Sequence, residues 1–146
     1  MVQRTVLVAD DESPVRLLCR VNLEADGYRV LEAVDGNAAL DQARGELPDV
    51  IVLDVMMPGL DGWSVAEQLL ADPRTNGIPI VFLSARADTT DRTRGIELGG
   101  IDYITKPFDP TKLSETLHDV IARAERGESD ELRRTHLAEL RRLVDT

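Results

Sequence analysis

Residues 50–62, Val-Ile-Val-Leu-Asp-Val-Met-Met-Pro-Gly-Leu-Asp-Gly, decide the fold of this chain. Val50 to Leu53 form an unbroken aliphatic run, which is typical of a parallel strand buried on both faces. The run ends in a carboxylate, Asp54, and Pro58-Gly59 then predicts a turn before the next helix. Ligands bind outside the carboxyl ends of the strands in an open α/β sheet, so Asp54 is a candidate functional residue. Taken alone, this aspartate is explained equally well as a cap of the turn.

Four other short runs have the composition of strands and lie at residues 5–9, 28–33, 80–83 and 102–105. Helical segments alternate with them at residues 13–26, 37–46, 62–71, 89–98 and 109–127. Two of these helices have a clear start signal, because an N-cap residue precedes proline in Ser13-Pro14 and in Asp109-Pro110. Five strands alternating with five helices predict an α/β fold, a flavodoxin-like (βα)5 doubly wound parallel sheet with strand order 2-1-3-4-5.

The chain has 146 residues and a net charge of −10, from 27 acidic and 17 basic side chains. An acidic surface disfavours nucleic acid and anionic lipid, so we expect no direct DNA binding and no membrane association. The sequence shows no membrane span and no apolar signal-peptide core, which predicts a cytoplasmic protein. We interpret Cys19 and Trp63 as core residues, and His118 as a solvated surface histidine.

The predicted strands deliver polar side chains to one edge of the sheet, because the carboxyl ends of parallel strands lie together. These residues are Asp10, Asp11, Asp54, Ser84 and Lys106. Three neighbouring carboxylates repel one another, and such oxygen ligands hold a divalent cation, for which Mg²⁺ is the natural choice. Lys106 and Ser84 are then interpreted as partners of a phosphate group, and Asp54 as a nucleophile. A structural Ca²⁺ or Mg²⁺ site braced by Lys106 is the alternative, but it leaves Ser84 without a role.

With these motifs the chain resembles the receiver domain of two-component response regulators. The resemblance extends from about Thr5 to Ala124 and rests on several motifs at matching spacings. They are Asp10-Asp11-Glu12, the segment Leu53 to Gly62 around Asp54, Ser84-Ala85-Arg86, and Asp102-Tyr103-Ile104-Thr105-Lys106-Pro107-Phe108.

The resemblance implies a chemistry for the site. Asp54 would accept a phosphoryl group from a histidine kinase or a phosphotransfer protein. Asp11, Asp54 and the backbone carbonyl of Met56 would bind Mg²⁺, and Asp10 would assist through a metal-bound water. Lys106 would pair with Asp54 and then with the phosphoryl oxygens, next to a cis Lys-Pro bond.

The resemblance also implies a switch. Ser84 would move to bond the phosphoryl group, and Tyr103 would turn inward behind it. A downstream effector would then bind the surface formed by the helix at 89–98, the strand at 102–105 and the helix at 109–127. The first of these helices has few apolar residues, so we expect it to be weakly packed and the most mobile.

Two further classes of function stay open. The first is a Mg²⁺-dependent phosphatase that acts on small molecules through an aspartyl-phosphate, but Met56 stands where such an enzyme needs a second acid. The second is a phosphorylation-independent scaffold, which is disfavoured because every catalytic position is filled. We therefore expect a signalling switch that catalyses only its own phosphorylation and dephosphorylation. We also expect Met56 and Arg86 to slow hydrolysis of the phosphoryl group, because they flank the path of the attacking water.

Residues 127–146 follow the predicted receiver domain of residues 1–126 as a linker and a short helix. Ser129 is a plausible N-cap for this helix, with Asp130 and Glu131 in its first turn. Its leucines lie among arginines, and a helix of this length is marginal in water by itself. It must dock on the receiver domain, pair with another chain or stay frayed. We favour a partner-binding or dimerising helix, with a possible homodimer, over a nucleic-acid patch, because acidic residues separate the arginines.

Overall fold

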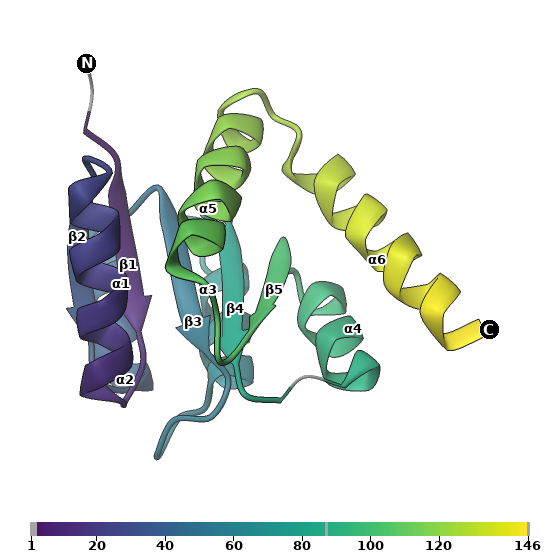
Figure 1. Ribbon diagram of the computed structural model, residues 1–146, viewed down its shortest axis with the longest axis horizontal. Helices are drawn as coiled ribbons and strands as arrows, with labels where there is room; N and C mark the ends of the chain where they lie inside the picture. The colour runs from purple at the N-terminus through teal and green to yellow at the C-terminus, as the bar shows by residue number, and fades with distance from the viewer. Residues whose placement is uncertain (1–2, 87, 146) are drawn as a thin grey trace.

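A five-stranded parallel sheet in the order β2-β1-β3-β4-β5 forms the centre of the molecule (Figure 1). The structure is a computed structural model and describes residues 3–86 and 88–145. The strands are β1 (Thr5–Ala9), β2 (Arg29–Ala33), β3 (Val50–Asp54), β4 (Ile80–Ser84) and β5 (Asp102–Thr105). The helices are α1 (Ser13–Ala25), α2 (Gly36–Glu46), α3 (Gly62–Ala71), α4 (Thr89–Glu97), α5 (Pro110–Glu125) and α6 (Ser129–Asp145). The predicted fold class, strand order and C-terminal helix are confirmed.

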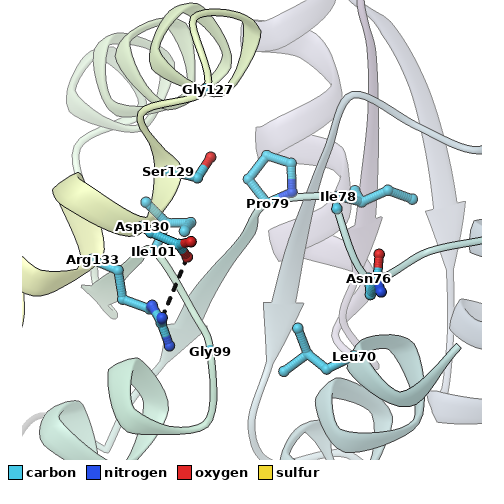
Figure 2. A pocket seen from close by; sticks show the side chains of 11 residues that line it. Leu70, Asn76, Ile78, Pro79, Gly99, Ile101, Gly127, Ser129, Asp130 and Arg133 are labelled. Atoms are coloured by element: carbon cyan, nitrogen blue, oxygen red, sulfur yellow. Dashed lines mark hydrogen bonds and ion pairs between the residues drawn. The ribbon is translucent and has the colours of Figure 1, made fainter. Parts of the chain in front are cut away.

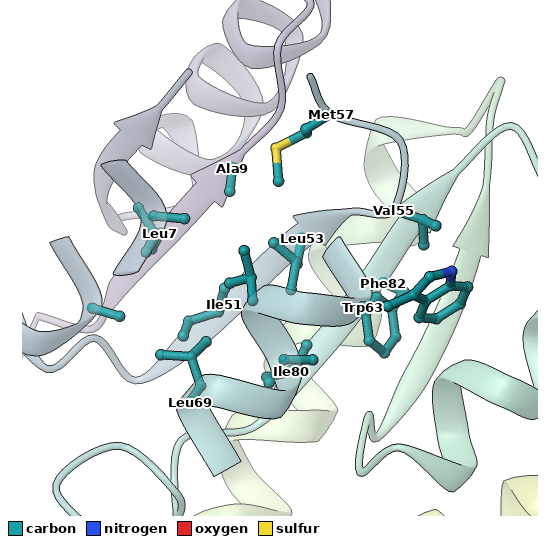
Figure 3. Packing of buried hydrophobic residues seen from close by; sticks show 14 of the residues in the cluster. Leu7, Ala9, Ile51, Leu53, Val55, Met57, Trp63, Leu69, Ile80 and Phe82 are labelled. Carbon is teal, nitrogen blue, oxygen red and sulfur yellow. The ribbon is translucent and has the colours of Figure 1, made fainter. Parts of the chain in front are cut away.

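Helices cover both faces of the sheet, as the apolar composition of the strands predicts. In β3, Ile51 and Leu53 point into a cluster with the buried residues of α2 and α3, while Val50 and Val52 point into a second cluster with α1 and α5. Figure 3 shows the first cluster, in which Phe82 of β4 lies beside Trp63. The alternation along each strand therefore fixes which side chains form each half of the core.

The helix starts agree with the predictions at α3, α4 and α5, whereas α2 begins at Gly36, one residue before the predicted Asn37, and α1 differs at its N-cap. The helix begins at Ser13, and its N-cap is Glu12, whose side chain makes no capping hydrogen bond. The prediction of Ser13 as the N-cap is therefore wrong, because Pro14 occupies the second helical position rather than the first. Asp109 is the N-cap of α5, as predicted, and its side chain accepts a hydrogen bond from the Thr111 amide at 2.9 Å.

The interpretations of three isolated residues are confirmed. Cys19 is fully buried, and burial raises the pKa of its thiol to about 12, so it is an inert core residue. Trp63 is 4% exposed and packs on Phe82 with ring centroids 5.1 Å apart, while the Arg94 guanidinium lies 4.8 Å from its ring. His118 is exposed on α5. Among the described residues, no helix combines the length and the apolar character that crossing a membrane requires.

The C-terminal helix α6 docks on the receiver domain beside α4 (Figure 1). Of the three alternatives for this helix, the structure shows docking on its own domain. It begins at Ser129, so this residue is the first helical residue and the prediction that it is the N-cap is wrong by one position. Asp130 and Glu131 lie in the first turn, as expected. The buried residues of α4 are Asp91, Gly95 and Ile96, so its apolar contribution is small, as its sequence predicts. The sequence did not predict that α6 packs against α4. The side chain of Val144 lies outside the described residues.

The first residue of α3, Gly62, lies against the end of β3. A Cβ atom at this position would stand 2.2 Å from the carbonyl oxygen of Asp54 and 2.7 Å from the Cα atom of Val55. The Gly62 amide donates a hydrogen bond to the Val55 carbonyl at 2.9 Å. A glycine here therefore brings the loop that follows Asp54 into contact with the strand end that carries it.

We predict that Gly62→Ala lowers the free energy of unfolding by about 2–3 kcal/mol, because backbone atoms must move to admit the methyl group. Gly45→Ala is the matched control, since a Cβ at Gly45 meets nothing within 4 Å. This control should stabilise the protein by about 0.5 kcal/mol through higher helix propensity. Urea unfolding followed by circular dichroism measures both, and equal stabilities of the two variants would contradict the prediction.

Candidate functional site

The predicted site residues lie together at the carboxyl edge of the sheet. Asp10 follows β1, Asp54 and Ser84 end β3 and β4, and Lys106 follows β5. Main-chain bonds fix the first carboxylate, since Asp10 Oδ1 accepts from the Glu12 amide at 2.8 Å. The strand termini therefore position the side chains.

The site is acidic and largely buried. Asp10 is 0% exposed and Asp54 is 3% exposed, whereas Asp11 lies at the surface. One carboxylate oxygen from each of these three residues lies within 4.8 Å of the others. Burial, together with the neighbouring Asp10 carboxylate, raises the pKa of Asp54 to about 6, although Lys106 and the Met56 amide act in the opposite direction. Burial and the Asp10 carboxylate together therefore outweigh the stabilising effect of Lys106 on the ionised form of Asp54.

Lys106 joins the buried carboxylates. Its Nζ atom lies 2.8 Å from Asp10 Oδ2, 3.3 Å from Asp54 Oδ2 and 3.7 Å from Glu12 Oε2. Burial lowers the pKa of Lys106, but the hydrogen bond to Asp10 and the attraction of both aspartates outweigh it, so the pKa is raised overall. The ammonium group is thus held in its charged form between two strand ends. The Lys106-Pro107 peptide bond is cis, as the resemblance implies.

The donor set fits a hard divalent cation such as Mg²⁺. Three carboxylates from two strand ends offer oxygen ligands, which Mg²⁺ prefers. Asp10 Oδ2 is buried and makes no well-aligned hydrogen bond, although it forms the ion pair with Lys106. Apart from Lys106, this buried oxygen has no donor among the described residues, so it has capacity left for a cation or its water shell.

The predicted switch residues lie beside this cluster. Ser84 is 0% exposed, and its Oγ atom accepts a hydrogen bond from the Arg86 amide at 3.2 Å. Tyr103 is 5% exposed, and its hydroxyl donates to the Arg86 carbonyl at 2.6 Å. Burial raises the pKa of the Tyr103 phenol, while the Ser84 hydroxyl acts in the opposite direction. The Tyr103 side chain therefore points inward and touches the segment that carries Ser84.

The backbone of Met56 lies next to the acidic cluster, because its amide donates to Asp54 Oδ1 at 3.2 Å. Its side chain is 57% exposed. A cavity of about 400 Å³ opens at this side of the cluster, and it is lined by Asp11, Val55, Met56, Met57, Pro58, Asp61, Trp63 and Arg86. Met56 and Arg86 thus share one cavity at the approach to Asp54.

Sequence reasoning missed two polar contacts of the site. Arg16 on α1 donates to the Asp10 carbonyl at 2.6 Å and so supports the backbone that carries the carboxylate. Arg86 pairs with the buried Asp91 of α4 at 3.2 Å, which ties the loop after Ser84 to that helix. The first contact had a signal in the sequence, because Arg16 lies one helical turn after Glu12 on the face that adjoins the strand end. The second depends on the turn between β4 and α4, for which the sequence has no comparable signal.

The sequence profile of the response regulator receiver domain matches residues 6–118 of this chain. The chain is similar to the phosphate regulon transcriptional regulatory protein PhoB of Pseudomonas aeruginosa, with 41% identity over 130 residues, covering 89% of this chain and 57% of that protein. It is also similar to the alkaline phosphatase synthesis transcriptional regulatory protein PhoP of Bacillus subtilis, with 42% identity over 124 residues, covering 85% of this chain and 51% of that protein. The chain therefore spans about half the length of these relatives.

The structure is similar to the receiver domain of the Francisella response regulator 1452, with a TM-score of 0.78 and 34% identity. The match covers 83% of this chain and 98% of that one. Receiver domains of this family are switches of two-component signalling. From the profile match, the relatives and the fold, the chain belongs to the response regulator receiver domain family.

Proposed function

We propose that Asp54 accepts a phosphoryl group from a histidine kinase or a phosphotransfer protein, and that this change switches the binding of a downstream effector. One observation carries the proposal. The Lys106 ammonium group lies between two buried carboxylates, 2.8 Å from Asp10 and 3.3 Å from Asp54, at the edge of the sheet where ligands bind. A scaffold gains nothing from burying two negative charges beside one positive charge.

The residues of the site have separate roles in the transfer. An Asp54 oxygen attacks the phosphorus atom of a phosphohistidine, the P–N bond breaks, and the imidazole leaves with the bonding electrons. The Lys106 ammonium group stabilises the negative charge on the phosphoryl oxygens, and the Ser84 hydroxyl donates a hydrogen bond to one of them. Hydrolysis by water later restores the Asp54 carboxylate. The chain then catalyses only its own phosphorylation and dephosphorylation.

The acidic residues would hold Mg²⁺ during both reactions. Asp11, Asp54 and the Met56 carbonyl would bind the ion, and Asp10 would assist through a water molecule. Bound Mg²⁺ supplies positive charge that offsets the repulsion between the carboxylates and an incoming phosphoryl group. Asp10 also holds Lys106 in place, since the two groups are 2.8 Å apart.

The output of the switch would pass through Ser84 and Tyr103 to the surface of α4, β5 and α5. The names of the relatives support an effector that controls transcription, because PhoB and PhoP are transcriptional regulatory proteins. A receiver unit at residues 1–126 with an appended linker and helix at 127–146 stays a prediction, as do a cytoplasmic location and a possible homodimer. The phosphatase and scaffold alternatives are not favoured by the family.

The first prediction of this proposal concerns labelling. Incubation with acetyl phosphate and Mg²⁺ should add one phosphoryl group, about 80 Da by intact mass, to the wild-type chain. Asp54→Asn should show no gain, and Asp41→Asn, which changes an exposed acid of α2, should label like wild type. A sizing column run at once reports whether phosphorylation changes the oligomeric state. A gain in Asp54→Asn, or none in wild type with Mg²⁺, would overturn the proposed role of Asp54.

The second prediction concerns pH and metal. Because the pKa of Asp54 in the folded chain is about 6, above the ordinary 3.8, ionised Asp54 destabilises the fold. This cost is absent below pH 3.8 and complete above pH 6. In EDTA at pH 7.5, Asp54→Asn should therefore raise the free energy of unfolding by about 1–2 kcal/mol. Urea unfolding should show that the gain fades as the pH falls through this window, and that Mg²⁺ reduces it at pH 7.5. Asp41→Asn should show no such gain, and a gain that grows toward pH 4 would refute the electrostatic explanation.

The third prediction concerns the lifetime of the phosphoryl group. Met56 and Arg86 line the cavity beside Asp54, so replacing both by smaller or polar groups should admit water more readily. Met56→Asn with Arg86→Ala should shorten the phosphoryl half-life by about two- to tenfold, which corresponds to a barrier lower by up to about 1.4 kcal/mol. The conservative pair Met56→Leu with Arg86→Lys should keep the wild-type half-life. The decay is followed by intact mass after removal of acetyl phosphate, and equal half-lives in both double variants would count against this role.

A further inference from the structure

The helix α6 extends beyond the part of the chain that the family shares. The family profile ends at residue 118, and the Francisella receiver domain is matched over 98% of its own length while covering 83% of this chain. The profile therefore ends before α6 begins at Ser129. A role for this helix therefore has to be argued from its own contacts.

One stripe of α6 is buried against the receiver domain. Leu132 and Leu140, two helical turns apart, are 5% and 6% exposed. Leu140 belongs to the core cluster that contains Ile96 of α4 and Tyr103 of β5, and Leu132 belongs to the cluster that contains Ile101. The stripe thus covers β5, which lies at the edge of the sheet, and its junction with α4.

A polar contact fixes the middle of the stripe. His136, one turn after Leu132 and one turn before Leu140, places Nδ1 2.7 Å from the Ile101 carbonyl oxygen, so this nitrogen carries the proton. The Asp102 carboxylate lies 3.9 Å from the same nitrogen. Toward the end of α6, Arg141 reaches Glu97 of α4 at 3.4 Å, an exposed pair that contributes little. Leu132, His136 and Leu140 therefore make the buried contacts of α6, and Leu137 is partly buried beside them.

Cavities flank the docked helix. One of about 320 Å³ separates Gly127, Asp130 and Arg133 from Leu70 and Ile78 (Figure 2). A second, of about 210 Å³, lies between α6 and the surface of α4 and β5, and Tyr103 and Leu140 both line it. Incomplete packing of this kind forfeits dispersion contacts, so α6 can leave and return without unfolding the sheet.

Tyr103 connects the α6 seat to the site. Its ring lies in the same cluster as Leu140, and its hydroxyl donates to the Arg86 carbonyl at 2.6 Å. Arg86 in turn donates its amide to Ser84 Oγ at 3.2 Å. We propose that α6 is an internal clamp, in which Leu140 and His136 act as positioning residues that hold Tyr103 inward and so keep the Ser84–Arg86 segment in place to receive a phosphoryl group on Asp54. The inference rests on the proposed function of Asp54.

Docking of α6 should raise the affinity of the site for a phosphoryl group, because it preorganises the segment around Ser84. A docked α6 restrains Tyr103, and a restrained Tyr103 fixes the carbonyl beside Ser84, so less ordering remains to be done when a phosphoryl group arrives. Because coupling between two sites is reciprocal, a phosphoryl group on Asp54 should also tighten the docking of α6. The α4 and β5 surface is then more fully covered by α6 in the phosphorylated chain, which makes α6 itself part of the surface offered to a partner.

The test measures the affinity of the full chain for beryllium trifluoride, which mimics a phosphoryl group on a carboxylate, in saturating Mg²⁺. Trp63, the single tryptophan of the sequence, lines the cavity beside Asp54 and provides the fluorescence signal. Leu140→Ala and His136→Ala should each weaken this affinity about five- to tenfold, while their Mg²⁺ affinity stays within about twofold of wild type. Leu140→Met should restore most of the loss, and Arg134→Ala, on the exposed side of α6, should match wild type.

A double-mutant cycle separates positioning from general destabilisation. In a Tyr103→Phe background, which lacks the hydroxyl bond to Arg86, Leu140→Ala should change the affinity by less than about twofold. Hydrogen–deuterium exchange adds a readout without the phosphoryl mimic, since Leu140→Ala should raise exchange in the segment around Arg86.

The outcomes distinguish the two proposals. A wild-type chain that does not bind the mimic would overturn the role of Asp54, and raised exchange in Leu140→Ala would then support only the restraint of the Arg86 segment by α6. Normal binding by wild type, Leu140→Ala and His136→Ala, or an equal loss in the Tyr103→Phe background, would overturn the clamp and leave Asp54 as the phosphoacceptor.

Discussion

The interaction on which the rest of this structure depends is the contact of one ammonium group with two buried carboxylates. Lys106 follows the last strand of the sheet, whereas Asp10 and Asp54 belong to the ends of β1 and β3, so the contact joins three strand termini across the carboxyl edge. Burying two acids beside one base leaves a net negative charge in a region of low dielectric constant. Burial, together with the neighbouring Asp10 carboxylate, raises the pKa of Asp54, and the excess negative charge makes the same edge attractive for a cation. The buried carboxylates thus lower the stability of the fold at the candidate functional site.

Backbone geometry keeps this charged edge in register. The loop after Asp54 returns to the strand through Gly62, and a side chain there would collide with the Asp54 carbonyl. A second close approach occurs at Gly36, where a Cβ would stand 2.3 Å from the Leu60 carbonyl oxygen of the same loop. Two glycines on different helices therefore hold the β3–α3 loop from both sides. The position of the loop backbone, rather than the Met56 side chain, brings the Met56 amide within hydrogen-bond distance of Asp54.

Much of the fold and of the site could be predicted from the sequence, because both depend on strand ends. Aliphatic runs that stop at Asp54 or Ser84 locate the strand and its functional terminus at once, and parallel topology then brings distant residues together. The N-cap of α1 was misassigned by one residue because Ser-Pro occurs at the start of a helix in two ways. The serine can be the N-cap, or it can be the first helical residue. The docking of α6 could not be predicted, since its leucine stripe fits a partner chain as well as its own domain. Only the position of Ile101 and Tyr103 at the sheet edge makes the internal seat available.

The placement of Tyr103 has a consequence for how a signal travels. The residue lies on β5 in the same buried cluster as Leu140 of α6, and its hydroxyl bonds the Arg86 carbonyl in the loop that follows Ser84, so one side chain adjoins both the loop beside the candidate site and the packing of the outer helix. A buried rotamer with a fixed hydroxyl partner has discrete alternatives rather than a continuous range, because the surrounding core is packed. A small displacement of Ser84 can therefore shift the equilibrium between the docked and the released position of α6. Such a conversion needs only a modest difference in affinity between the two states, since a factor of ten corresponds to about 1.4 kcal/mol. The net contribution of one hydrogen bond is of that size, and truncation of one buried leucine costs more. Under the proposed function of Asp54, a seat of α6 that is held by few buried contacts is thus sensitive to a change of this size.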